Sequence, residues 1–185
     1  MYEIGDLIVK ANTGVCKVVN IVNLDMSEID RNKLYYQLIP LEDEKAKIYV
    51  STENACLTTR KIMTMKEAID LIEHVADVEI LAIANEKLRE QKYKEIIKSN
   101  NPKELIQIIK TTYLRSKERL VKGMKNTVAD KKYLGLAEKM LFSELRVVLG
   151  KDNEEVHTLI KMSVEKSNNS RMNPPGINAI FDQTT

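Results

Sequence analysis

Residues 2–57 alternate short apolar runs with polar turns, a pattern typical of β-strands. The runs 7–11 and 15–22 are rich in β-branched side chains and flank an Asn-Thr-Gly turn. Gly14 can adopt the positive φ that a tight hairpin requires. The sequence therefore predicts an N-terminal β-hairpin.

Two more apolar runs, 33–39 and 45–50, continue this region and are separated by a loop that begins at Pro40. Four or five short antiparallel strands can bury their apolar face only if the sheet curls or closes. We therefore predict a small Tudor-like or SH3-like β-barrel over residues 1–60. A module of this kind is expected to bind a partner.

Downstream of Thr59 the apolar spacing becomes helical, and cap residues mark the ends of about five helices. The predicted boundaries are a capping box at Thr64 and Glu67, a second helix from Asp77 to about Asn100, a third from Asn101 to Gly123, a fourth from Thr127 to Gly150, and a fifth from Asp152 or Asn153 to about Lys166. The fold class is thus α+β, with a compact all-α domain over 61–166 and a flexible tail over 167–185.

Composition is that of an ordinary globular protein, with 43% apolar and 30% charged residues. No apolar run is long enough to span a bilayer and no signal segment is evident, so we expect a cytoplasmic protein without a membrane partner. Cys16 and Cys56 lack CxxC spacing; two reduced, partly buried thiols are the simpler interpretation, and a disulfide would depend on their geometry.

Candidate catalytic and metal-binding residues are sparse. His74 and His157 have no partner at metal-ligand spacing, which favours surface or helix-end positions. Helical acids such as Glu138 and Glu144 are interpreted as solvated. The sequence contains no phosphate-binding glycine loop and no HExxH or Gly-x-Ser-x-Gly motif. We therefore expect no cofactor, no metal, no small-molecule substrate and no enzymatic activity.

Positive charge is concentrated in the helical part. Residues 1–60 carry 7 Lys/Arg against 9 Asp/Glu, whereas residues 61–185 carry 22 against 18. Between Lys110 and Lys132 there are eight Lys/Arg and only two acids, and helical spacing puts Lys110 opposite the apolar stripe of its helix. Such a face could follow a nucleic-acid backbone in a salt-sensitive, sequence-independent manner, or it could simply be solvated.

Three segments together resemble a known family. These are Ile-Gly-Asp-x-Ile-Val-x-x-x-x-Gly-Val-x-x-Val at 4–18, Tyr-Tyr-x-Leu at 35–38 and Ile-x-Val-x-x-Glu-Asn-Ala at 48–55. They resemble the RNA-polymerase-interacting domain of the bacterial CarD/CdnL transcription regulators, which is related to a domain of transcription-repair coupling factors. The helical segment Asp-Lys-Lys-Tyr-Leu at 130–134, with the apolar positions up to 145, fits the same family, so the resemblance covers about residues 1–150.

The resemblance implies a transcription regulator with two contacts. The β-domain would dock on the β subunit of RNA polymerase, and the basic helical domain would touch promoter DNA and modulate open-complex stability. Many members insert a tryptophan into the minor groove, but this chain has no Trp and Glu86 falls at or near that position. Because a glutamate cannot act as a wedge and repels phosphate, any DNA contact must rely on cations.

Alignment of this sequence with the family pattern assigns candidate site residues. Polymerase docking is assigned to Asn23, Leu24, Lys47 and Tyr49, although Leu24 and Tyr49 could equally be core residues. Weak, non-specific DNA contact is assigned to Lys87, Arg89, Lys92, Arg115, Arg119, Lys122 and Lys125. Pairing of an edge strand with the partner would use main-chain groups and leave little trace in the sequence.

One alternative function belongs to a different class. The β-domain could bind a protein or peptide unrelated to transcription, with the helices serving as an adaptor or dimerisation unit and without DNA contact. A pull-down that recovers a partner other than polymerase would favour that scaffold.

Overall fold

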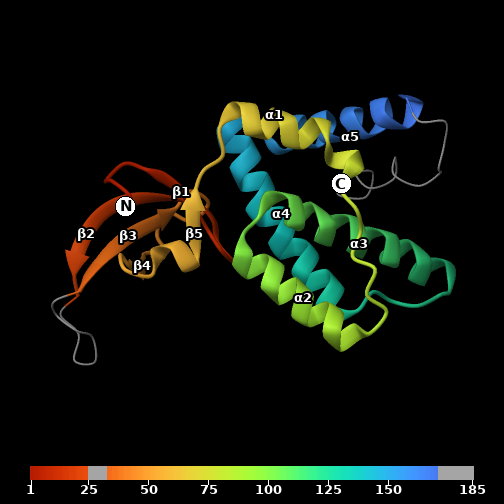
Figure 1. Ribbon diagram of the computed structural model, residues 1–185, viewed down its shortest axis with the longest axis horizontal. Helices are drawn as coiled ribbons and strands as arrows, with labels where there is room; N and C mark the ends of the chain where they lie inside the picture. Colours follow the sequence, from red (N-terminus) through yellow and green to blue (C-terminus); the bar gives the residue numbers. More distant parts are fainter. Residues whose placement is uncertain (25–32, 171–185) are drawn as a thin grey trace.

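The computed structural model describes residues 1–24 and 33–170, and it confirms an α+β architecture. Residues 1–61 contain the β-sheet and the rest of the described chain forms a group of helices; these two parts of the molecule, called the sheet half and the helical half, lie side by side along the long axis (Figure 1). The helix α4 crosses the centre of the helical half, with α1 and α5 along one of its sides and α2 and α3 along another.

The elements follow in the order β then α. The strands are β1 (Leu7–Lys10), β2 (Gly14–Asn23), β3 (Leu34–Pro40), β4 (Ile48–Ser51) and β5 (Thr59–Lys61). The α-helices are α1 (Met65–Glu73), α2 (Glu86–Ser99), α3 (Pro102–Val121), α4 (Val128–Leu149) and α5 (Asn153–Ser170). Two single-turn 3₁₀ helices, η1 (Ala55–Leu57) and η2 (Val75–Asp77), precede β5 and follow α1.

The predicted hairpin is confirmed. Strands β1 and β2 pair antiparallel, with Lys10 opposite Gly14. Gly14 has φ +102° and Asn12 has φ +64°, so the turn uses the left-handed conformations that glycine and asparagine tolerate best.

The five strands form one antiparallel sheet in the order β4-β3-β2-β1-β5. The ladder between β2 and β3 shifts between Val18 and Asn20, which is a bulge that increases local twist. Within the described part of the chain β4 and β5 remain the two outer strands, so the sheet is open and the predicted closed barrel is not observed. The sequence predicted four or five strands but located only four; β5 is the fifth, and only three of its residues pair with β1.

One face of the sheet carries its own apolar core. Its buried members are Ile8, Cys16, Val18, Tyr36, Leu38 and Ala55. Tyr2 packs edge-on against Tyr36 with ring centroids 5.4 Å apart, and its backbone N–H donates to the Tyr36 hydroxyl. The N-terminus is thereby fixed to this core.

Most predicted helix boundaries are confirmed, because the caps make the expected hydrogen bonds. Thr64 and Glu67 form a complete capping box, and the side chains of Asn101 and Thr127 accept backbone N–H groups of α3 and α4. Gly150 ends α4 with φ +62°. The prediction that Asp77 opens the second helix is wrong, since α2 begins at Glu86 with Asn85 as its N-cap.

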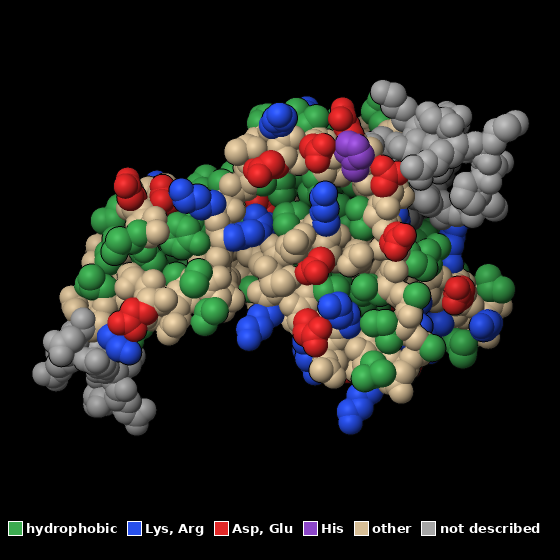
Figure 2. Space-filling model, in the orientation of Figure 1, with side chains coloured by type: hydrophobic (Ala, Val, Ile, Leu, Met, Phe, Trp, Pro, Cys, Tyr) green, Lys and Arg blue, Asp and Glu red, His purple; other side chains and the backbone are tan. Residues whose placement is uncertain are grey.

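A second, larger core joins the five helices, and α4 supplies many of its members. The α4 members are Tyr133, Ala137, Met140, Leu141, Phe142 and Leu145. The expectation that Glu144 is solvated is wrong, because this α4 side chain is fully buried. Lys/Arg and Asp/Glu side chains are interspersed over the helical half in the view of Figure 2.

Helix α5 continues to Ser170, and residues 171–185 of the predicted tail lie outside the described residues. Both cysteines are free: Cys16 is buried and Cys56 is exposed, so the expectation of two unpaired thiols is confirmed, while partial burial does not hold for Cys56. Burial raises the pKa of the Cys16 thiol to about 11.

Candidate functional site

Two of the predicted docking residues lie at the outer strand β4. Tyr49 is in the middle of β4 with its side chain 43% exposed, and Lys47 directly precedes the strand and is exposed. Strand β4 pairs with β3 on one side only, and its other side has no strand partner in the part of the chain that is described. An outer strand with an exposed tyrosine is a suitable surface for a protein partner.

The other two predicted docking residues lie apart from Tyr49. Asn23 ends β2 opposite Leu34, and Leu24 follows it half-buried. Tyr49 is opposite Gln37. Because Leu34 and Gln37 are an odd number of positions apart on β3, Asn23 and Tyr49 project from opposite faces of the sheet. The structure therefore does not gather the four residues into one patch.

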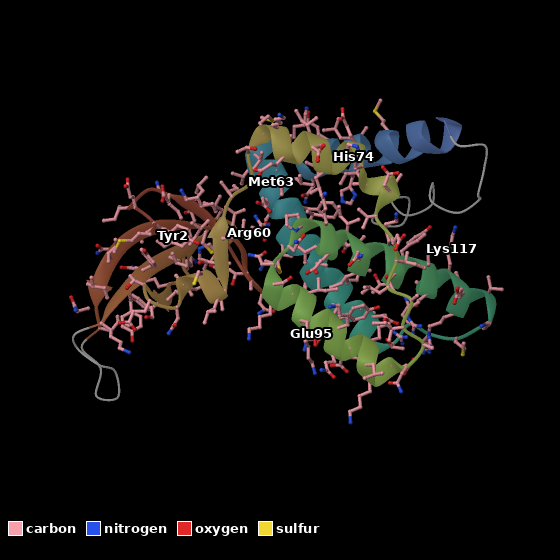
Figure 3. The ribbon with its side chains drawn as sticks, in the orientation of Figure 1. Tyr2, Arg60, Met63, His74, Glu95 and Lys117 are labelled. Carbon is pink, nitrogen blue, oxygen red and sulfur yellow. The ribbon has the colours of Figure 1, made fainter. Side chains whose placement is uncertain are left out.

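The sheet is joined to the helices by a buried ion pair. Arg60 on β5 donates from Nη1 and Nη2 to the two carboxylate oxygens of Glu144 on α4, at 2.6 and 2.5 Å. The backbone N–H of Met63 also donates to Glu144, at 2.8 Å. Arg60 lies at the junction of the two halves in Figure 3. A bidentate pair with a third donor fixes both groups in one geometry.

Further hydrogen bonds cross the same junction. The Asn100 side chain, at the C-terminal end of α2, donates to the Val9 carbonyl at 2.9 Å, and Arg60 Nε donates to the Asn100 carbonyl. The backbone N–H of Val15 donates to Ser143 Oγ on α4. These contacts set the orientation of the sheet against the helical half. We refer to Arg60, Glu144 and Asn100 as the junction network.

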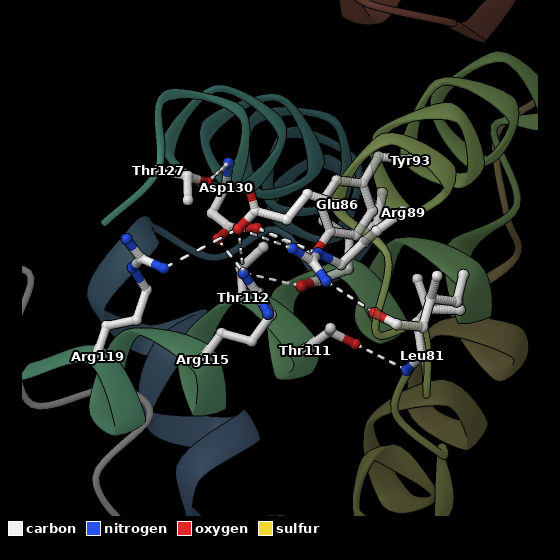
Figure 4. Close-up of polar contacts among 12 residues, drawn as sticks. Leu81, Glu86, Arg89, Tyr93, Thr111, Thr112, Arg115, Arg119, Thr127 and Asp130 are labelled. Carbon is white, nitrogen blue, oxygen red and sulfur yellow. Dashed lines mark hydrogen bonds and ion pairs between the residues drawn. The ribbon is translucent and has the colours of Figure 1, made fainter. Parts of the chain in front are cut away.

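Arg89 and Arg115, both predicted DNA contacts, form part of a charged cluster between α2, α3 and α4. The Arg89 side chain is only 3% exposed and donates to the carbonyl of Ile83 at 2.7 Å. Arg115 donates from Nε to Asp130 at 3.2 Å, and Arg89 Nε lies 3.9 Å from the same carboxylate. Figure 4 shows that Asp130 lies between these arginines.

Asp130 is the centre of that cluster and is itself almost fully buried. Its backbone N–H donates to Thr127, and its carboxylate also accepts from the Tyr93 hydroxyl at 3.3 Å. Burial and the neighbouring Asp130 charge raise the pKa of Tyr93, so the phenol keeps its proton and remains a donor. The sequence did not suggest this role for Asp130, because its partners lie far away along the chain.

Arg119 lies one turn further along α3 than Arg115. Its Nε donates to the Lys125 carbonyl at 2.8 Å, which ties the loop after α3 back onto the helix. Its Nη1 lies 4.0 Å from Glu86 Oε1, and Arg115 Nη2 lies 3.6 Å from the same oxygen. The structure thus brings Arg89, Arg115 and Arg119 together around the first residue of α2 (Figure 4).

The predicted lysine contacts are distributed more widely. Lys87 is exposed in the first turn of α2, and Lys122 and Lys125 are exposed at the loop between α3 and α4. Lys92 is half-buried and forms an ion pair with Glu95 at 3.4 Å. The loop lysines follow Arg119 in the chain, and the Lys125 carbonyl accepts a hydrogen bond from Arg119, so the loop lies next to the arginine cluster.

Lys110 does not lie on the exposed face where helical spacing placed it. Its side chain is 7% exposed, and its Nζ donates to the carbonyls of Val75, Ala76 and Val78. Burial lowers the pKa of this amine. The lysine therefore caps the turn after α1 from within the helical core and is unavailable to a nucleic acid.

The described residues contain no cluster of three or more His, Cys, Asp or Glu side chains that could hold a metal ion. In the same residues, every helix is too short or too polar to cross a membrane.

Comparison with known families assigns both halves of the chain. Residues 2–63 match the family described as CarD-like/TRCF RID domain, and residues 71–161 match the family described as CarD, C-terminal domain. No curated protein matches the chain closely enough to be counted as a relative. The two matches follow one another along the chain; the first covers the sheet, and the second covers α2, α3 and α4 completely and parts of α1 and α5. The chain therefore belongs to the CarD-like family of RNA-polymerase-interacting proteins.

Proposed function

We propose that this protein is a non-enzymatic transcription regulator that docks on the β subunit of RNA polymerase through its β-sheet half. The observation that carries the proposal is the match of residues 2–63 to the CarD-like/TRCF RID domain, over a sheet whose outer strand β4 has no second strand partner among the described residues. The resemblance implies a Tudor-like barrel. In the open five-stranded sheet, the exposed Tyr49 on β4 offers an anchor, and the main-chain groups on the outer side of β4 can pair with a strand of the partner.

We further propose that the helical half contacts promoter DNA without reading its sequence and thereby modulates the stability of the open complex. Support comes from the exposed Lys87, Lys122 and Lys125 beside the arginine cluster. Cations on phosphates give affinity that falls steeply with salt. The junction network favours concerted action, because a fixed orientation lets one half position the other on the polymerase.

Docking is tested with purified protein and RNA polymerase, or the isolated β lobe, by co-migration on a sizing column. We expect co-migration, and we expect Tyr49→Ala to weaken binding about tenfold. Leu41→Ala is the matched control, since Leu41 has a similar exposure of 41% but lies in the loop after β3. Absence of co-migration by a folded protein would contradict the proposal, and capture of a different protein partner would favour the scaffold.

DNA contact is tested by salt titration of binding to a short duplex. Lys122→Glu should weaken binding and reduce the salt slope by about one, because one phosphate contact is lost. Lys66→Glu, on the exposed surface of α1, makes the same charge change away from the loop and should have less effect. Equal behaviour of the two variants would indicate that the loop lysines are merely solvated.

A further inference from the structure

Three arginines from two helices surround one exposed carboxylate. Glu86, the first residue of α2, places Oε1 3.5 Å from Arg89, 3.6 Å from Arg115 and 4.0 Å from Arg119. These separations exceed those of charge-assisted hydrogen bonds, so each pair is electrostatic and loosely constrained. The Glu86 side chain is 66% exposed and has room to rotate into solvent.

The three arginines are held in place by other groups. Arg115 is hydrogen-bonded to Asp130, Arg119 to the Lys125 carbonyl, and Arg89 to the Ile83 carbonyl. In Figure 4 the guanidinium groups converge on the carboxylates from different sides. Because none of these anchors involves Glu86, the guanidinium groups would keep their positions if that side chain moved away.

The balance of charges indicates what would happen if the Glu86 side chain moved away. The three guanidinium groups face two carboxylates, Asp130 and Glu86, and Asp130 is 6% exposed and hydrogen-bonded on several sides. Glu86 is therefore the only one of the two that can leave. Its departure would uncover two positive charges in excess, beside the first backbone N–H groups of α2 and the exposed Lys87. A guanidinium cluster of this kind suits a phosphate group.

We infer that Glu86 is an internal counter-ion that occupies a phosphate site formed by Arg115 and Arg119, with the buried Arg89 behind them, and that it gives way to a backbone phosphate of duplex DNA. This inference rests on the DNA contact proposed above and identifies where that contact is made. In the free protein the carboxylate competes with phosphate for the same cations. The apparent affinity for DNA is therefore lowered, and it is proportional to the fraction of molecules in which Glu86 has left the site.

The experiment compares Glu86→Gln with Glu90→Gln. Both variants remove one negative charge from α2, but Glu90 faces Lys94 at 3.2 Å and lies outside the arginine cluster. Binding of a short fluorescein-labelled duplex is followed by anisotropy over a range of salt concentrations. Glu86→Gln should bind about three- to tenfold more tightly than Glu90→Gln, with a salt slope steeper by about one, because one more phosphate is engaged.

Arg119→Gln tests whether the tighter duplex binding of Glu86→Gln requires the arginine cluster. When Arg119→Gln is already present, the increase in duplex affinity caused by Glu86→Gln should fall by at least half, because one arginine of the site is missing. A gain that persists in full would mean that the variant acts only through net charge and would overturn the inference.

Inorganic phosphate distinguishes a DNA phosphate from a free anion. We expect phosphate to raise the thermal midpoint of Glu86→Gln more than that of Glu90→Gln. If phosphate does so while the duplex affinities of the two variants are equal, the site takes small anions and the assignment to DNA is overturned. If the parent protein binds duplex but the two variants are indistinguishable, this inference fails and the proposed function stands. If no form binds duplex, the DNA contact and the inference fail together.

Discussion

Two arginine–carboxylate sites in this protein contrast sharply. At the junction network, Glu144 is fully buried and receives three short hydrogen bonds, two of them from Arg60. At the start of α2, Glu86 is largely exposed and its three arginine partners lie at 3.5–4.0 Å. Both sites pair a glutamate with arginine, but they differ in burial, in geometry and in the number of arginines.

This difference in burial and geometry makes the Arg60–Glu144 pair structural and the pairing of Glu86 with its arginines exchangeable. A buried carboxylate cannot lose its partner without leaving an uncompensated charge in a region of low dielectric constant. An exposed carboxylate loses little, because water and salt replace the arginines. The junction network is therefore suited to holding the two halves of the molecule, whereas Glu86 is suited to yielding its place to another anion.

Replacement of Glu144 by alanine gives the largest expected effect. The change leaves the Met63 N–H buried without its acceptor and Arg60 without its counter-ion, so we expect a loss of about 3 kcal/mol in the free energy of unfolding. Glu86→Gln should change the same quantity by less than about 0.5 kcal/mol. Urea unfolding followed by circular dichroism measures both, and equal losses would contradict the distinction drawn between the two sites.

Replacement of Gly14 by alanine tests the packing part of the junction. Gly14 has φ +102°, and a Cβ there would lie 2.6 Å from Ser143 Oγ on α4. Strain and overlap together should cost about 2 kcal/mol in the free energy of unfolding. Adding Ser143→Ala removes the overlapping oxygen and should restore part of the loss in a urea titration. Wild-type stability of the single variant would show that the turn can relax away from α4.

The smallest expected effects come from two histidines, one half-buried and one exposed. Burial lowers the pKa of His157, which packs on Phe142, below its usual value of 6.5. The unfolded chain then binds the proton more readily, so this histidine reduces stability as the pH falls below 6.5. His157→Gln should therefore lessen the loss of stability in acid.

His74 should affect stability in acid in the opposite direction. A hydrogen bond to the Asp70 carbonyl and the nearby Asp70 carboxylate raise the pKa of this exposed ring. Its contribution is present below pH 6.5 and is lost as the pH rises through the raised pKa. His74→Gln should remove a small gain in stability at acid pH. Urea midpoints of both variants, measured on either side of pH 6.5, test the two signs, and shifts in the same direction would contradict them.

Local signals were sufficient for most of the fold. The hairpin at Gly14, the capping box at Thr64, the Asn101 and Thr127 caps and the stop at Gly150 all depend on neighbouring residues, and each was predicted correctly. The prediction that Asp77 caps the second helix failed because of a contact between residues that are far apart in the sequence. Lys110, on α3, donates to the carbonyls of Val75, at the start of η2, and Val78, just after it, and the chain then runs without helical structure to Asn85.

The site was predictable only in part, because its electrostatics depend on tertiary pairing. Spacing along α2 and α3 correctly indicates that Arg89, Arg115 and Arg119 are basic positions on helices. It cannot indicate that Asp130 holds two of them, since Asp130 lies on α4 and is buried against Tyr93. The same limit applies to Glu144, whose partner Arg60 belongs to the strand β5.

The unequal exposure of the two cysteines has a practical consequence. Cys16 is buried and its raised pKa keeps it in the unreactive thiol form, whereas Cys56, in η1 on the sheet half, is exposed. A maleimide dye should therefore attach at Cys56 alone in the native sequence. The protein thus provides its own single labelling position for fluorescence experiments, within the half that is proposed to meet the polymerase.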